Sequence, residues 1–515
     1  MRQLGVPLLI VATCVAYLPA LQGGFVWDDR LFIVDNPLLG HLDGLRRIWL
    51  DPGGAIAQYY PLTVSSFWLE HRFFRLDPSG YHAVNILLHV ANALLVRLLF
   101  RRLALPGAEL AALVFALHPV HVESVAWISE RKNLLSGLLY LSAGLAYLRF
   151  RGLCDERGHE RFPFYFLALL LFAGALLAKT VTASLPAAIL LVLWWKEGRL
   201  GARDVALLLP FFVLGIAAGL NTARMERVHV GASGADWDYT WIERVLISSR
   251  ALCFYPAKLI WPSPLAFSYP RFAIDPSAVA SYLYGVALAA VAALLFFGRA
   301  RIGRGPLVAL LFFAGTLFPA LGFVDVYPMR FSFVADHFQY LASLGPIAAF
   351  AAGIAGALER TRSASARRAG QVVIAVLLLA LAGQTYLHSR TFRDEETVWR
   401  DTLAKNPDSW LAHNNLGQIL GLRGEHALAL QHFRRAVALE PDDHVLETNL
   451  AEALVHSGEY DEALLHARRA VELHPDHADA HWFVWVAASE LGELEEASRH
   501  LRRQALDGGA DRGGR

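Results

Sequence analysis

The chain has few charged residues and few cysteines for its length. Of its 515 residues 18% are charged, whereas 55% are hydrophobic and the mean hydropathy is +0.37; soluble proteins carry about a quarter charged residues. The net charge of +1 provides no field that would attract nucleic acid. Three widely spaced cysteines without a CxxC pair indicate neither a disulfide framework nor a zinc site. This composition predicts an all-α, polytopic membrane protein.

The common motifs of soluble enzymes are also missing. The sequence contains no phosphate-binding glycine loop, no serine-nucleophile elbow and no HExxH pair. A soluble, nucleotide-driven activity is therefore unsupported.

Apolar runs close to the roughly 20 residues that cross a bilayer recur through the first part of the chain. We expect a transmembrane domain over residues 1–390 with about eleven spans, the first of them an uncleaved helix rather than a signal peptide. The candidate spans are residues 4–22, 81–100, 107–121, 133–149, 162–178, 181–195, 204–222, 278–298, 306–323, 336–358 and 370–388.

The connections after the even-numbered spans are short and rich in arginine, as at residues 97–102 and 360–368. Such connections stay in the cytoplasm, so the N-terminus is predicted to be cytoplasmic. Residues 242–260 are apolar but carry four charged side chains, and we expect an amphipathic helix in the membrane interface. The long connections 23–80 and 223–277, and the C-terminus, are then extracytoplasmic.

From residue 391 the sequence becomes polar and repeats with a period of 34. The period is carried by Pro407, Pro441 and Pro475 and by Gly424, Gly458 and Gly492. It resembles tetratricopeptide repeats. We expect an α-solenoid over residues 391–515, with repeats near 408–441, 442–475 and 476–508, that binds a polypeptide in its concave face.

Polar side chains gather on the predicted outer face. Carboxylates and cations at a membrane surface are costly unless they are paired or used. The polar side chains on this face are Asp28 and Asp29 after the first span, Lys179 between the fifth and sixth spans, and Arg330, Asp336 and His337 before the tenth span. Their common location predicts a site.

The second span carries Asn85, His89 and Asn92 at i, i+4 and i+7, on one helix face. These groups either form interhelical hydrogen bonds or line a polar cavity below the outer loop.

The third connection contains His118, His121 and Glu123, followed by Arg131 and Lys132. Two imidazoles and a carboxylate suit a divalent metal, but a proline separates the histidines and no further ligand is evident, so a polar loop is the competing interpretation. Arg131 and Lys132 are placed either to hold a lipid phosphate or to snorkel to the interface.

Several of these runs together resemble one family. Residues 25–29, 85–89, 118–127, 178–179 and 335–341, followed by the repeats, are similar to the transmembrane and tetratricopeptide-repeat protein O-mannosyltransferases, and the chain looks like a bacterial relative. The resemblance implies a GT-C glycosyltransferase fold. It implies a sugar donor, typically mannose, on a dolichyl or polyprenyl phosphate, and a serine or threonine hydroxyl as acceptor.

The resemblance also assigns residues. The acidic pair of the family matches Asp28 and Asp29, and its basic residue after the His-Pro motif matches Arg131. Two positions depart from the pattern, because Thr180 follows Lys179 and His337 stands where relatives often have arginine. These departures leave the phosphate ligand and the sugar open.

We therefore expect an inverting transferase in a bacterial inner membrane, with one aspartate, Asp28 in preference, as general base. Metal is not expected, and the partners are the lipid-linked donor, an acceptor polypeptide and membrane lipids. Competing interpretations are a non-enzymatic scaffold and a transferase that acts on glycans. The expected donor-phosphate ligands are Arg131, Lys132, Lys179 and Arg330, and the expected lining residues are Asn85, His89, His118, His121, Glu123, Asp336 and His337.

Overall fold

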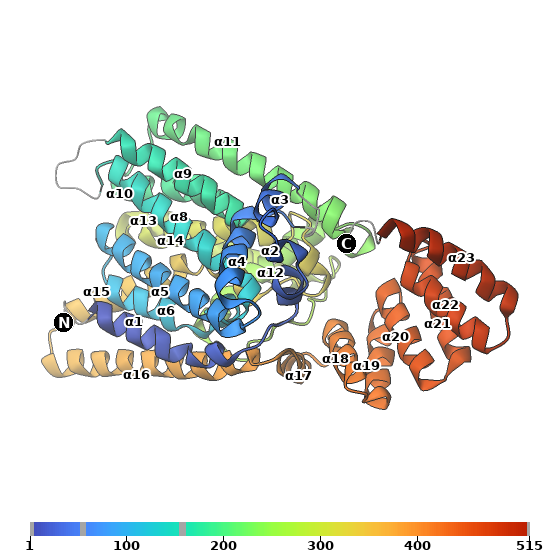
Figure 1. The fold of residues 1–515 in the computed structure, drawn as a ribbon. Helices are drawn as coiled ribbons and strands as arrows, with labels where there is room; N and C mark the ends of the chain where they lie inside the picture. Colours follow the sequence, from blue (N-terminus) through green and yellow to red (C-terminus); the bar gives the residue numbers. More distant parts are fainter. Residues whose placement is uncertain (1–4, 52–57, 154–160, 512–515) are drawn as a thin grey trace. The chain divides into compact units, whose positions relative to one another are not determined.

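The computed structural model describes residues 5–51, 58–153 and 161–511. Cys154 lies outside the described residues. Every regular element of the described part is a helix or helical turn (Figure 1). The chain divides into two compact units, residues 1–267 with 271–395, and residues 268–270 with 396–515.

The first unit is a bundle of long helices with several short ones between them (Figure 1). Its helices are α1 (Gly5–Ala16), α2 (Pro37–Gly40), α3 (Gly44–Leu50), α4 (Pro61–Phe74), α5 (Pro78–Arg102), α6 (Ala108–Leu117), α7 (Val122–Ala126), α8 (Arg131–Phe150), α9 (Phe162–Ala178), α10 (Leu185–Glu197), α11 (Ala202–Met225), α12 (Trp241–Ile260), α13 (Leu283–Ile302), α14 (Gly305–Leu317), α15 (Leu344–Arg360) and α16 (Ala364–Ser389).

Four helical segments of the described chain are long and apolar enough to cross a membrane. They are Pro78–Arg102, Ala202–Val230, Val279–Ile302 and Ala364–Phe392, and the bent pair of α6 and α7 would make a fifth. These segments indicate an integral membrane protein. Shorter apolar helices occur at several of the other candidate spans, so the count of eleven stays a prediction.

Local sequence explains where the helices that frame the site begin and end. The Asp77 carboxylate accepts a hydrogen bond from Ser79 N (3.0 Å) and Pro78 opens α5, a favourable N-terminus. Pro119 forces the preceding His118 into an extended conformation, which ends α6. The chain resumes as α7 after a bend of 55°. The predicted span 107–121 thus contains helix α6, a break at His118 and a 3-10 turn at Pro119–His121.

The tenth predicted span differs in detail from the structure, and the predicted location of residues 242–260 in the membrane interface stays open. The predicted span 336–358 starts as a 3-10 turn at Asp336–Gln339, and helix α15 begins only at Leu344, so Asp336 and His337 precede the helix. Residues 242–260 do form a helix, α12, whose start is fixed by reciprocal hydrogen bonds between Thr240 and Glu243. Its place in the interface stays a prediction.

The second unit consists of helix pairs. Its helices are α17 (Glu395–Lys405), α18 (Trp410–Leu422), α19 (His426–Leu439), α20 (His444–Ser457), α21 (Tyr460–Leu473), α22 (Ala478–Glu490) and α23 (Leu494–Asp511). The same ion pairs recur one period later: Arg434 with Glu459 and Glu462, and Arg468 with Glu493 and Glu496. Each of the pairs α18–α19, α20–α21 and α22–α23 is therefore one copy of a repeating unit with a period of 34 residues.

Candidate active site

The site is built around the short elements that join α6 to α8. A 3-10 turn at Pro119–His121, helix α7 and a second turn at Ile128–Glu130 follow one another without a loop. All residues from 118 to 134 are buried. This compact path places Glu123, Glu130 and Lys132 in one interior region.

The connection that follows α1 is fixed to this region through Asp29. The Asp29 carboxylate accepts hydrogen bonds from Ser129 N (2.7 Å), from the Ser129 hydroxyl and from Val26 N (2.9 Å). Its side chain is fully buried. Burial raises the pKa of Asp29 to about 7, although the Ser129 and Val26 donors oppose the shift. Because both oxygens are engaged, Asp29 is placed to hold the loop.

The neighbouring Asp28 is in a different environment. Its side chain is partly exposed, and it forms no side-chain hydrogen bond within the described ranges. Burial raises the pKa of Asp28, the Lys132 ammonium lowers it, and Glu130 raises it again. Asp28 thus has an unengaged carboxylate whose pKa is raised on balance, a change that favours proton uptake by a general base.

Two lysines share one carboxylate beside Asp28. Glu130 Oε1 lies 3.1 Å from Lys132 Nζ, and Glu130 Oε2 lies 3.1 Å from Lys179 Nζ. Burial alone would raise the pKa of Glu130, but His337, Lys132 and Lys179 hold it well below its usual range. Burial lowers the pKa of Lys179, and the Glu130 charge opposes this. Because the two ammonium groups lie on the two oxygens of one carboxylate, they are close enough together to donate to one phosphate.

Glu123 and His337 form a second pair next to Glu130. Glu123 Oε2 accepts from His337 N (3.0 Å), and Glu123 Oε1 lies 2.8 Å from His337 Nδ1. The other ring nitrogen of His337 lies 4.0 Å from Glu130 Oε1, and Asn133 donates to the His337 carbonyl (2.9 Å). His337 therefore links the turn before α15 to the two glutamates.

Arg131 lies apart from these groups. All five N–H donors of a guanidinium have partners here, and Arg131 is fully buried. The partners are Glu70, Asn85, Ser66 and the Tyr81 carbonyl. The geometry favours a structural role for Arg131, whereas Lys132, Lys179 and Arg330 stay predicted phosphate ligands.

The polar groups of α5 are used within the bundle. Asn85 donates to the Val125 carbonyl (3.1 Å) and accepts from Arg131. His89 contacts the Tyr340 hydroxyl (2.9 Å) and the Ala116 carbonyl (3.1 Å), and Asn92 donates to the Leu134 carbonyl (2.9 Å). These contacts favour interhelical hydrogen bonding over a polar cavity.

The histidines of the third connection also have separate partners. His118 contacts the Leu259 carbonyl (2.9 Å), whereas His121 contacts the Phe115 carbonyl (2.7 Å) and the Ser343 hydroxyl (3.0 Å). Among the residues that the structure describes, no group of three or more His, Cys, Asp or Glu side chains could hold a metal ion.

Two predicted site residues lie before α15. Arg330 Nε donates to Asp236 Oδ2 (3.0 Å). Asp336 is buried, and Gln339 lies within 3.4 Å of its carboxylate. The contribution of either residue to the site stays a prediction.

Sequence reasoning missed Glu130 and Glu70. Both are the carboxylates that compensate buried cations, Glu130 for Lys132 and Lys179 and Glu70 for Arg131. A buried cation requires such a partner. Glu130 directly precedes Arg131 and Lys132 and could have been found from that rule, whereas Glu70 is 61 positions away from Arg131 and gives no local signal.

Comparison with known proteins adds the following. Tetratricopeptide-repeat profiles match residues 381–444 and 422–481. Protein O-mannosyl-transferase Tmtc3 of Drosophila melanogaster is 26% identical over 521 aligned residues, which cover 83% of this chain and 54% of that protein. Protein O-mannosyl-transferase TMTC4 of Homo sapiens is 27% identical over 486 aligned residues, which cover 81% of this chain and 64% of that protein.

Among solved structures, the crystal structure of MamA is 18% identical and covers 27% of this chain and 81% of its own, with a TM-score of 0.22. That similarity is too low to support a conclusion. The chain spans roughly half to two thirds of the length of the two curated relatives above. It is a distant homologue of protein O-mannosyl-transferases and carries tetratricopeptide repeats.

Proposed function

We propose that this chain is a membrane glycosyltransferase that moves a sugar from a polyprenyl-phosphate donor to serine or threonine hydroxyls of a polypeptide on the extracytoplasmic side. Mannose is the proposed sugar, by analogy with the names of the relatives. The observation that carries the proposal is the arrangement of Asp28, a carboxylate without a hydrogen-bond donor in the described part of the chain, beside two lysines that share Glu130.

The proposed reaction uses these charges in a single displacement. The acceptor oxygen attacks the anomeric carbon while Asp28 takes the hydroxyl proton. The bond from that carbon to the phosphate oxygen breaks, and Lys132 and Lys179 stabilise the negative charge on the departing lipid phosphate. With one carboxylate as base and none as nucleophile, the sugar inverts its configuration.

The repeats are proposed to hold the acceptor polypeptide. Stacked helix pairs present an extended concave surface that suits a polypeptide segment. The same feature would serve a non-enzymatic scaffold, so the repeats do not distinguish the two functions, whereas the charge arrangement around Asp28 favours an enzyme.

The test is transfer of labelled mannose from polyprenyl-phosphate mannose to a Ser/Thr-rich polypeptide by the purified full chain. Asp28→Asn is expected to lower kcat by about 10² to 10⁴-fold, the usual contribution of a general base. Asp35→Asn is the matched control, because Asp35 lies in the same connection and is exposed with Arg30 as its ion-pair partner. Full activity of Asp28→Asn would eliminate Asp28 as the base.

The same assay tests the phosphate ligands. Lys179→Met is expected to lower kcat by about 10² to 10³-fold, as for removal of one preorganised donor. Lys405→Met is the control, because Lys405 pairs with Asp401 in the second unit. Transfer to a glycan instead of the polypeptide would favour the glycan-directed alternative, and no transfer from any lipid-linked sugar would favour the scaffold.

A further inference from the structure

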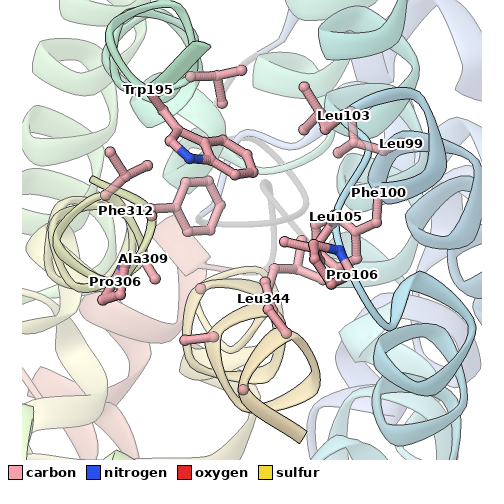
Figure 2. Close-up of a pocket in the computed structure, with 18 of the residues that line it drawn as sticks. Leu99, Phe100, Leu103, Leu105, Pro106, Trp195, Pro306, Ala309, Phe312 and Leu344 are labelled. Carbon is pink, nitrogen blue, oxygen red and sulfur yellow. The ribbon is translucent and has the colours of Figure 1, made fainter. Parts of the chain in front are cut away.

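An apolar cavity of about 370 Å³, partly open to the surface, lies in the first unit among α5, α8, α10, α14 and α15. Trp195 and Phe312 line one side, and Leu99, Phe100 and Leu103 line the opposite side (Figure 2). The volume is within the range of pockets that bind small molecules, roughly 300–1,000 Å³. The walls are almost entirely hydrocarbon.

Small side chains on α15 leave this space open. Ala348, Ala352 and Gly356 line the cavity at intervals of four residues, so they share one face of the helix. A Cβ atom placed on Gly353 or Gly356 would meet no atom within 4 Å. The space beside this face is therefore not occupied by the protein.

A space with these walls needs an apolar occupant. Water in a cavity requires polar partners, and the lining offers few of them. An empty space would forfeit the dispersion contacts of all the side chains around it. For helices in a bilayer, a lipid hydrocarbon chain is the available filling.

Arg360 supplies the polar end of the cavity. It is the last residue of α15, continues the face of Ala352 and Gly356, and lines the same cavity. Its side chain is exposed and has no hydrogen-bond or ion-pair partner in the described ranges of the chain. Guanidinium groups bind phosphate well, and basic pockets between membrane helices hold phospholipid head groups.

We propose that this cavity binds one acyl chain of an anionic phospholipid, with the lipid phosphate at Arg360. The arginine-rich connection at residues 360–368 is predicted to be cytoplasmic, so the lipid would come from the cytoplasmic leaflet. This inference is independent of the proposed transfer reaction.

The cavity is distinct from the candidate active site. Lys132 of the site and Tyr140, which lines the cavity, are 8 residues apart on α8. At 1.5 Å per residue this separation is about 12 Å along the helix. A donor phosphate at Lys132 and Lys179 therefore leaves the position at Arg360 to a second lipid.

The test is native mass spectrometry of the full chain, purified in mild detergent from bilayers that contain equal amounts of phosphatidylglycerol and phosphatidylcholine. The wild type is expected to retain one phosphatidylglycerol. Gly356→Leu fills the cavity from the open face of α15 and is expected to lower the retained fraction roughly tenfold, equivalent to 1.4 kcal/mol. Arg360→Gln is expected to retain phospholipid without preference for phosphatidylglycerol.

Two matched controls separate the cavity from general effects. Gly383→Leu introduces the same side chain at an exposed position of α16, where a Cβ atom would also meet no atom within 4 Å. Arg368→Gln removes an exposed arginine of the same connection. Both should behave as the wild type. Retention that is unchanged in Gly356→Leu and Arg360→Gln, absence of retained lipid in the wild type, or retention of polyprenyl phosphate instead would each overturn the proposal.

Discussion

Asp29 is a buried carboxylate whose charge state should depend on pH near neutrality. Its folded-state pKa of about 7 is above the usual value for aspartate because burial disfavours the ion. An acid with a raised folded pKa stabilises the fold at low pH, and this contribution is lost as the pH rises through the folded pKa. Between about pH 4 and pH 7 the stability of the wild type should therefore fall relative to Asp29→Asn.

Thermal unfolding of the two proteins at a series of pH values checks this expectation. The difference in Tm between the wild type and Asp29→Asn should shrink or change sign as the pH rises, and level off above about pH 7.5. Asp35→Asn should give a curve parallel to the wild type, because Asp35 is exposed. A constant difference between wild type and Asp29→Asn would show that Asp29 does not titrate in this range.

Arg131 offers a prediction about stability rather than transfer. Its guanidinium connects α8 to Glu70 of α4 and to Asn85 of α5. Lysine keeps the charge but has three donors instead of five, so Arg131→Lys leaves Glu70 and its neighbours incompletely bonded in the interior. The free energy of unfolding should fall by about 1–3 kcal/mol, the cost of leaving buried hydrogen-bonding groups without a partner.

Chemical denaturation of Arg131→Lys, with Arg149→Lys as the exposed control, measures this loss. The KM for the lipid-linked donor should stay close to the wild-type value in whatever fraction of Arg131→Lys remains folded. A raised KM without loss of stability would instead restore Arg131 to the phosphate-binding set.

Among the helices, the repeats contain a glycine whose role is purely conformational. Gly458 follows α20 with a φ of 75°, a left-handed conformation, and a Cβ there would meet no atom within 4 Å. Gly458→Ala therefore introduces backbone strain without a clash, and should destabilise the α20–α21 pair by about 1 kcal/mol.

Gly421 is the matched control, because it lies inside α18, where alanine is favoured over glycine by up to about 1 kcal/mol. Amide hydrogen exchange of the full chain should show faster exchange in α20 and α21 for Gly458→Ala, and equal or slower exchange in α18 for Gly421→Ala. Equal protection in both variants would mean that the left-handed residue does not limit the stability of the repeat.

The elements also show which features a sequence can reveal. The repeats follow from local signals, since the same proline, glycine and ion-pair positions recur every 34 residues. The sequence could predict that these polar groups lie near one another, but it could not show which of them pair. The pairs of Glu123 with His337 and of Arg131 with Glu70 join residues far apart in the sequence. Only the folded structure shows whether such a side chain is used in a hydrogen bond or is left to bind a ligand.

At the scale of the whole molecule, the number of membrane crossings decides on which side each part of the chain lies. Helix length and composition give four or five crossings among the residues that the structure describes, whereas the alternation of arginine-rich connections predicts eleven. An odd number of crossings with a cytoplasmic N-terminus places the repeats outside, on the same side as Asp28. If α12 crossed the membrane, the count would be even and the repeats would be separated from Asp28 by the bilayer.

Reporter fusions in a bacterial host distinguish these cases. A reporter that is active only outside the cytoplasm should be active after residue 515 and inactive in the turn after α10 at Gly198, which the even-connection rule predicts to be cytoplasmic. A third fusion after Ile260 should be active if α12 lies in the interface, because the chain has then not crossed since the connection began. Activity at Gly198 together with inactivity after residue 515 would reverse the orientation. It would place both the candidate base and the repeats where a lipid donor of the outer leaflet cannot reach them.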